Sequence, residues 1–333
     1  MRLGTWLHEL PTTRTEADTM IERLAAMGIT TLIAAFKNWT GPAYYPSEIA
    51  YTQPGFADGG LLGHLIDRCH DAGVDFEAWT CTFTEAGPSK LTDAHPECRA
   101  LNADGTEYRV EYNGGAWACP AQQATQDYEL SFCREVLARY PAIDRLHLDY
   151  IRYPNAEVCR CAYCQTEFRE LYGFDLLTDV MPGGSEGKAF DAFVRWRCGH
   201  IKRFVSRAHD LAAAAGKQLT AAVFPYYPSI MYDMGQDWLD WCRDGLLDAA
   251  YPMNYNWSDL MVERYTTMHR QLLGQSRVAL CEGLGLKDGM SAADVQSLSA
   301  AALDHGSDGV IFFECHTLVQ LPLDTLAPWR GNG

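Results

Sequence analysis

The chain has 333 residues, of which 47% are hydrophobic and 12% are aromatic. This composition is ample for a large buried core and excludes a disordered chain, because disorder requires a low apolar content. The formal net charge of −16 at pH 7 repels phosphate backbones. It therefore argues against nucleic acid as a partner and leaves neutral ligands open.

Short apolar runs alternate along the chain with longer stretches of helical periodicity. The predicted strands are Arg2–Leu7, Thr30–Phe36, Asp75–Cys81, Arg145–Tyr150, Gln218–Phe224, Ala249–Tyr255, Val278–Gly283 and Gly309–Glu314. The predicted helices are Thr15–Met27, Leu61–Ala72, Gln126–Arg139, Phe190–Ala214, Asp237–Arg243, Asp259–Leu273 and Ala292–Asp304. About eight strand–helix units predict an α/β fold, a closed (β/α)8 barrel of the TIM type, with residues 1–333 as one catalytic domain. A doubly wound open sheet is the alternative, but its glycine-rich phosphate turn is missing after the first strand.

Two predicted connections are much longer than the usual few residues. They run from about Phe83 to Thr125, after the third strand, and from Pro154 to about Gly187, after the fourth. Both follow the carboxyl ends of strands, which is the face of a barrel where catalysis takes place. Long loops at that face are more often functional than incidental, so we expect the site there.

The first residues lack the basic start and apolar stretch of a signal peptide, and no run approaches the roughly 18 apolar residues of a membrane span. We therefore expect a cytoplasmic protein with no membrane partner. The twelve cysteines then favour thiols or metal ligands over a disulfide framework. The sequence leaves open whether the chain forms a homo-oligomer.

An ordered set of motifs resembles the family-10-like glycoside hydrolases, a bacterial group of barrel proteins. The motifs are HLDYIRYP at His147–Pro154, GQDW at Gly235–Trp238, GLLD at Gly245–Asp248, YPMNY at Tyr251–Tyr255, HPE at His95–Glu97 and NADG at Asn102–Gly105. Each motif alone is modest, but together they span most of the chain in the expected order. The resemblance implies a TIM-type barrel and carbohydrate hydrolysis, and it supplies no particular substrate.

Asp149 is the leading candidate for a catalytic carboxylate. It ends an apolar strand, and strand alternation places it on the same side as His147. Arg152 and Tyr153 follow, where they could orient the carboxylate or hold sugar hydroxyls. The structural alternative is an aspartate that caps the next helix or pairs with Arg152.

Glycoside hydrolysis usually needs a second carboxyl group that faces the same bond. Glu282 and Glu314 end the predicted seventh and eighth strands, and Glu77 lies within the third. A carboxyl group in such an apolar setting is costly, and that cost is tolerated where a raised pKa is needed. Glu282 is favoured because barrels that resemble this one carry their second acid there. The alternative for each is a buried structural salt bridge.

Aromatic and polar residues recur near strand ends, where sugar faces could stack and hydroxyls could be held. The aromatic ones are Trp6, Trp39, Trp79, Tyr226, Tyr227, Tyr255 and Trp257. The polar candidates for substrate binding are His8, Lys37, Glu77, His147, Arg152, Asn254 and His316, and the aromatic candidates are Trp6, Trp79, Tyr226 and Tyr255. Taken singly, each aromatic residue is more often core filling, and a lone histidine is more often structural.

Three cysteines fall within six residues, at Cys159, Cys161 and Cys164. A tetrahedral zinc site needs four nitrogen or sulfur ligands, and close pairs of this kind form a knuckle. The stretch is similar to one in family 42 β-galactosidases, where an upstream cysteine completes a structural zinc site. That likeness implies Cys119 as the fourth ligand, with Cys98 as second choice. The alternatives are reduced thiols, or a disulfide in an oxidised sample.

These observations predict a glycoside hydrolase that acts on a carbohydrate or glycoconjugate. We expect a retaining mechanism with Asp149 as nucleophile and Glu282 as acid/base, and no cofactor for catalysis. One alternative is a sugar-binding barrel without turnover, which keeps the cleft and lacks a second acid. The other is a metal-dependent hydrolase that uses the cysteine-bound zinc, although all-cysteine sites are usually closed.

Overall fold

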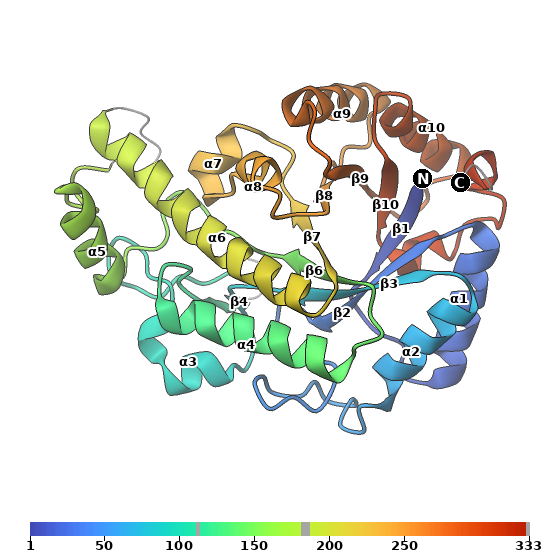
Figure 1. Cartoon of the computed structure of the whole chain (residues 1–333), viewed down its shortest axis with the longest axis horizontal. Coiled ribbons are helices and arrows are strands. Elements are labelled where there is room, and N and C mark those ends of the chain that lie inside the picture. Colours follow the sequence, from blue (N-terminus) through green and yellow to red (C-terminus); the bar gives the residue numbers. More distant parts are fainter. Residues whose placement is uncertain (111–113, 181–186, 331–333) are drawn as a thin grey trace.

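Eight parallel strands close into a barrel in the computed structural model, which describes residues 1–110, 114–180 and 187–330 (Figure 1). The strands follow one another around the barrel in chain order, and the last pairs with the first. They are β1 (Arg2–Leu7), β2 (Thr31–Lys37), β3 (Asp75–Cys81), β6 (Arg145–Asp149), β7 (Gln218–Val223), β8 (Ala249–Pro252), β9 (Ala279–Gly285) and β10 (Gly309–Phe313). The predicted (β/α)8 barrel is confirmed, and the open sheet is excluded because β1 pairs with both β2 and β10.

Helices cover the outside of the barrel, as the alternating pattern predicts (Figure 1). They are α1 (Arg14–Met27), α2 (Gly60–Asp71), α4 (Gln123–Arg139), α6 (Lys188–Ala214), α8 (Trp238–Arg243), α9 (Asp259–Leu273) and α10 (Ala292–Leu303). Local sequence fixes several of their ends. Thr13 and Glu16 form a capping box at the start of α1, and Gly28 ends it with a φ of 94°.

Smaller elements fill the loops. They are β4 (Thr84–Glu85), α3 (Lys90–Ala94), η1 (Pro96–Cys98), β5 (Ala116–Trp117), α5 (Ala162–Tyr172), α7 (Ser229–Met234), α11 (Cys315–Leu318) and η2 (Ala327–Trp329). Strands β4 and β5 pair antiparallel within the long connection after β3. Helix α5 lies in the connection after β6, at the edge of the molecule beside the amino-terminal part of α6 (Figure 1).

Strand β8 is shorter than predicted. The expected strand ran to Tyr255, whereas the regular strand ends at Pro252. Beyond it the Asn254 amide donates to the Pro252 carbonyl, which bends the chain out of the sheet. This bend brings Met253 and Tyr255 to the mouth of the barrel, so the departure from the predicted strand helps to build the site.

No helix within the described residues combines the length and the apolar composition that crossing a membrane would require.

Candidate functional site

A cavity of about 380 Å³ opens at the carboxyl ends of the barrel strands. Its lining residues come from seven of the eight barrel strands or the loops that directly follow them. They are His8, Trp39, Trp79, Asp149, Tyr150, Arg152, Phe224, Met253, Tyr255 and Phe313. The wall is thus mostly aromatic, and among these lining residues Asp149 alone carries a carboxyl group. A concave aromatic wall with a few polar groups is typical of a small-molecule site.

Asp149 is held in place by its own loop and by the loop after β3. The Tyr150 amide donates to Asp149 Oδ1 at 2.6 Å, and Thr82 donates to the Asp149 backbone carbonyl from both its amide and its hydroxyl at 2.8 Å. Burial raises the pKa of Asp149 to about 6, although the Tyr150 amide and the Arg152 charge oppose the rise. The Trp79 indole N–H also faces this carboxyl group, without reaching hydrogen-bond geometry within the described residues. Asp149 is therefore suited to carry a proton near neutral pH.

Tyr150 and Arg152 shape the wall beside this carboxyl group. Tyr150 has a φ of 55°, which is unusual for a tyrosine and turns the chain sharply after β6. The Arg152 guanidinium then lies over three aromatic rings, with its central carbon 4.8 Å from the Phe224 centroid, 5.0 Å from Tyr150 and 5.1 Å from Trp117. Cation–π contacts of this kind hold a guanidinium at a defined position. A positive charge is thus fixed next to Asp149.

His8 lies in the cavity wall, and Glu314 contacts it from just outside the lining residues. His8 Nδ1 lies 2.9 Å from Glu314 Oε2, and this contact raises the pKa of the imidazole. Both side chains keep solvent access, with 28% and 20% of their surface exposed. Glu314 follows β10, which lies four strands from β6 in the closed order of eight. Asp149 and Glu314 therefore approach the barrel mouth from opposite sides.

Glu282 does not face Asp149, which corrects the expectation that it is the acid/base. Its side chain points out of the barrel toward α9, where Glu282 Oε1 lies 2.7 Å from His269 Nδ1 and both residues are buried. Although burial lowers the pKa of His269, the adjacent Glu282 carboxylate raises it overall. The reason is strand alternation: the neighbouring Gly283 faces the lumen next to Trp6, so Glu282 must face the helices. Glu282 therefore has a structural partner.

Lys37 is also absent from the cavity, contrary to the substrate-binding role expected of it. It lies behind the barrel wall, where its Nζ is 2.6 Å from Glu85 Oε1 and 2.7 Å from Glu129 Oε2. All three side chains are at most 1% exposed. The carboxylates raise the pKa of Lys37 despite its burial. This ion triad joins β2, β4 and α4 and cannot reach a bound sugar.

Trp6, Glu77 and His147 form the floor beneath the cavity. The Trp6 indole donates to His147 Nε2 at 3.1 Å, and His147 Nδ1 lies 2.8 Å from Thr220 Oγ1. Thr220 and Tyr251 donate in turn to the two oxygens of Glu77 at 2.6 and 2.8 Å. Burial lowers the pKa of His147 to about 3, so the ring is neutral. These residues fill the lumen and support the site, whereas direct contact with a substrate had been expected.

Three other candidates for substrate binding lie away from the cavity. Asn254 is fully buried and its amide nitrogen approaches the Val262 carbonyl at 3.4 Å. His316 is at the surface, with its Nε2 3.1 Å from the Glu9 carbonyl. Tyr226 is exposed and its ring packs edge-on against Tyr265. Of the residues expected to bind substrate, the structure brings His8, Trp79, Arg152 and Tyr255 to the cavity together with Asp149.

Sequence reasoning did not assign five lining residues. They are Trp39, Tyr150, Phe224, Met253 and Phe313. All of them end a strand or follow one closely, and Trp39 was noted among the strand-end aromatic residues. Strand-end position was therefore a usable signal for these residues, whereas the bend after Pro252 that delivers Met253 has no clear sequence mark.

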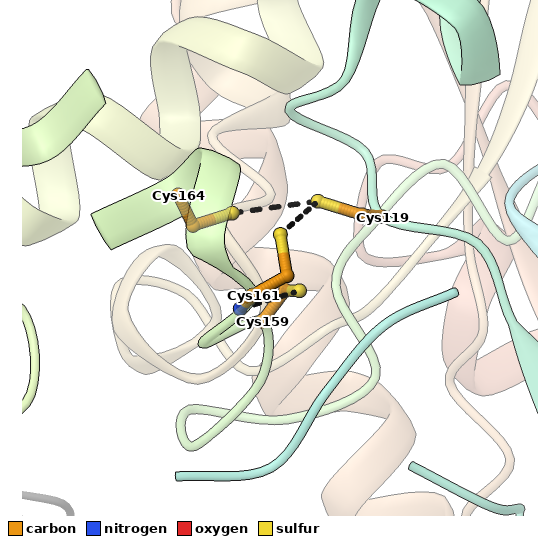
Figure 2. Close-up of side chains that lie close together, drawn as sticks. All are labelled: Cys119, Cys159, Cys161 and Cys164. Carbon is orange, nitrogen blue, oxygen red and sulfur yellow. Dashed lines mark hydrogen bonds between the residues drawn. The ribbon is translucent and has the colours of Figure 1, made fainter. Parts of the chain in front are cut away.

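The four expected cysteines form one buried group (Figure 2). The sulfur atoms of Cys119, Cys159, Cys161 and Cys164 all lie within 4.8 Å of one another, and Figure 2 shows Cys119 facing the other three from a separate loop. The Cys119 and Cys164 sulfurs are 3.4 Å apart, which is far beyond the S–S bond length of about 2.05 Å. Cys98, the second choice, instead contacts Gln122. The group could hold a metal ion.

Fold and site together define a (β/α)8 barrel of the glycosidase type, with an aromatic, carboxyl-bearing cavity at the catalytic face. Residues 4–299 match the family described as glycosyl hydrolase-like 10, and the chain belongs to that family. No protein with a curated function matches the sequence.

Several solved structures with the same architecture are glycosidases of low sequence identity. The PgaB (BpsB) glycoside hydrolase domain from Bordetella bronchiseptica is 10% identical, with a TM-score of 0.74 over 99% of this chain and 96% of that one. The catalytic domain of β-amylase from Paenibacillus polymyxa is 12% identical, with a TM-score of 0.69 over 97% and 94%. The β-galactosidase from the psychrophilic Marinomonas ef1 is 14% identical, with a TM-score of 0.68 over 94% of this chain and 54% of that one. These similarities show that the chain shares its barrel fold with these glycosidases.

Proposed function

We propose that the protein is an active glycoside hydrolase whose catalytic acid is Asp149. The observation that carries this proposal is a buried carboxyl group, with its pKa raised to about 6, in an aromatic cavity at the catalytic face of a barrel. A glycosidic oxygen is a poor leaving group unless it is protonated as the bond breaks, so a positioned acid of raised pKa is the central requirement.

The second carboxyl group in this proposal is Glu314, acting as general base with His8 holding its position. Strands about 4.8 Å apart and tilted by about 36° give an eight-stranded barrel roughly 15 Å across. Carboxyl groups that reach inward from opposite strands are then several ångströms farther apart than the roughly 5 Å of a retaining pair. This spacing favours an inverting mechanism, whereas a retaining one with Asp149 as nucleophile was expected from the sequence.

The proposed reaction conserves every atom and proton. Asp149 gives its proton to the glycosidic oxygen, while a water molecule attacks the anomeric carbon from the side of Glu314. The water transfers one proton to Glu314, and its oxygen stays on the sugar with inverted configuration. Asp149 regains a proton from solvent and Glu314 releases one. The aromatic rings provide apolar faces for the sugar, and Tyr255 and Phe313 stack at 5.3 Å between centroids beside the reacting groups.

A panel of phenyl glycosides, which differ in sugar and anomeric configuration, tests the proposal with the wild type and Asp149→Asn. Removing a general acid costs about 10²–10⁴-fold in rate, and the loss should appear in kcat with an unchanged circular dichroism spectrum. Glu282→Gln is the matched control, because it also alters a buried carboxyl group on a barrel strand but lies outside the cavity. Equal turnover by wild type and Asp149→Asn would overturn the assignment.

A sugar-binding barrel without turnover is the second candidate. It is favoured by one observation: Asp149 is the sole carboxyl group among the residues described as lining the cavity. In that case no phenyl glycoside would be hydrolysed, while saturable sugar binding would still be measured by calorimetry and weakened by Trp79→Ala.

We further propose that the four-cysteine group binds a structural zinc ion. Zinc–sulfur bonds of about 2.3 Å in a tetrahedron place the sulfurs about 3.8 Å apart. The 3.4 Å and 3.9 Å distances from Cys119 to Cys164 and Cys161 lie on either side of that value. The amides of Leu101 and Cys161 also donate to the Cys159 sulfur at 3.3 and 3.4 Å, which stabilises thiolate charge. Four buried thiolates leave no open position, so this zinc would join the two long loops and would not act in hydrolysis.

A further inference from the structure

A second hollow lies on the same face of the barrel, between the loop after β8 and the loop after β9. This groove encloses about 580 Å³. Its walls are formed by Trp257, Ser258 and Asp259 on one side and by Lys287–Met290, with the first turns of α10, on the other. None of the residues that line the Asp149 cavity is shared with it. The groove has no role in the hydrolysis steps described above.

Trp257 is the most unusual residue of the groove. Its side chain is 57% exposed, although exposing so large an apolar surface to water is unfavourable. The ring is nevertheless fixed. Its indole N–H donates to the Gly285 carbonyl at 3.0 Å, and the Lys287 ammonium lies 4.4 Å from the ring centroid. A fixed, exposed ring can stack against a ligand with little loss of side-chain entropy.

The groove lies next to the catalytic cavity. Trp257 follows Tyr255 by two residues, and Tyr255 lines the cavity. Gly285, whose carbonyl holds the Trp257 indole, packs directly against Tyr255, where an added Cβ would lie 3.0 Å from the tyrosine Cβ. Tyr255 and Gly285 thus lie between the cavity and the groove, so the two hollows are neighbours at the barrel mouth.

The charges of the groove restrict what it can bind. Asp259, Asp288 and Asp294 line it together with one cation, Lys287, so its formal charge is negative. Uronate and sulfate groups would be repelled there. Ser258 and Ser297 add hydroxyl groups, and Ser297 donates to Asp259 at 2.6 Å. Carboxylates, hydroxyls and one stacked aromatic ring match the hydroxyl groups and apolar face of an uncharged sugar.

We propose that this groove is an accessory subsite that binds further units of a neutral glycan chain, with Trp257 as the stacking platform. This inference rests on the proposed function, because it takes the cavity as the place where the same chain is cleaved. It assigns an oligo- or polysaccharide as the substrate class in place of a small glycoside, and it gives Trp257 a binding role that is separate from catalysis.

Affinity electrophoresis tests the binding without requiring turnover. Native gels contain mixed-linkage β-glucan, glucomannan, galactomannan or arabinoxylan as neutral polymers, and polygalacturonate or alginate as anionic ones. The proteins are Asp149→Asn, which holds substrate without cleaving it, and the same chain with Trp257→Ala added. Tyr51→Ala in the same background is the matched control, because Tyr51 is also exposed and has a lysine ammonium, that of Lys90, over its ring.

At least one neutral polymer should retard Asp149→Asn, and Trp257→Ala should weaken that binding about tenfold, which corresponds to about 1.4 kcal/mol. Tyr51→Ala should leave the binding unchanged. Equal retardation with and without Trp257, equal binding of anionic polymers, or no retardation by any polymer would overturn the subsite.

Kinetics separate this inference from the proposed function. In the Asp149-containing enzyme, Trp257→Ala should lower kcat/KM about tenfold on the polymer that retards the protein, and it should leave hydrolysis of a phenyl glycoside unchanged. If phenyl glycosides are not hydrolysed at all, the proposed function fails while the electrophoresis still decides the subsite.

Discussion

Lys37→Met should destabilise the protein strongly and leave its activity intact. The substitution keeps a long apolar side chain but removes the ammonium that lies 2.6 Å from Glu85 and 2.7 Å from Glu129. Two carboxyl groups, at most 1% exposed, would then share a buried site without a cation. Breaking a buried ion pair by removing one partner costs about 3–5 kcal/mol, and we expect a loss in that range.

The surface offers a matched comparison in Lys202. Its Nζ also contacts two carboxylates at 2.6 Å, those of Asp240 and Asp244, but its side chain is 33% exposed. Exposed pairs are worth about 0–1 kcal/mol, so Lys202→Met should change stability by less than 1 kcal/mol. The two variants differ in burial far more than in contact geometry.

Urea unfolding at pH 7, followed by tryptophan fluorescence, measures both variants against the wild type. Hydrolysis by the folded Lys37→Met variant well below its melting temperature should be normal, since Lys37 lies outside the cavity. A stability change as small as that of Lys202→Met would refute the reasoning from burial. Normal stability with lost activity would restore the substrate-binding role that the sequence suggested for Lys37.

Three further predictions concern the cysteine group, Glu129 and Asp149. We expect one zinc ion per wild-type chain by mass spectrometry, and a wild type without zinc would contradict the proposed site. Cys161→Ser should lose the ion and on the order of 5 kcal/mol of stability, whereas Cys98→Ser should keep the ion. Burial, reinforced by Glu85, raises the pKa of Glu129 from 4.5 to about 8, so the folded state holds a proton that the unfolded chain loses. This group therefore stabilises the fold fully below pH 4.5, and its contribution is lost as the pH rises through 8; Glu129→Gln should flatten that decline, and an unchanged pH dependence would count against it. Since Asp149 must carry a proton, kcat/KM on phenyl glycosides should fall as the pH rises through about 6, and a rise through that range would contradict its role as the acid.

The barrel could be predicted from the sequence because its pattern is local. Apolar runs of five to seven residues alternate with amphipathic stretches, and Arg2–Leu7 and Asp75–Cys81 have the predicted bounds. The cysteine group was predictable for a related reason, because three of its four cysteines are close in sequence. The short elements of the long loops, such as β4 and β5, depend on tertiary contacts and carry no comparable pattern.

The site was predicted less completely, because the side of a strand that a residue faces depends on its register. Asp149 was placed from its strand end and lies in the cavity. Glu282 was also predicted near a strand end, but it lies in the middle of β9, and alternation along that strand turns it outward to His269, which is 13 residues away on α9. Lys37 lies at the bulged end of β2, where the pairing register shifts after Ala35, and this irregularity cannot be read from composition.

The leaving-group dependence of Asp149→Asn tests the central claim most directly. The rate ratio of wild type to variant is measured on two glycosides of the same sugar. In the 2,4-dinitrophenyl glycoside the leaving phenolate departs without a proton, whereas in the phenyl glycoside the leaving group needs a proton. If Asp149 is the acid, the ratio should be about 10²–10⁴ on the phenyl glycoside and within about tenfold of unity on the dinitrophenyl one. A large and equal loss on both would contradict the account and identify Asp149 as the nucleophile.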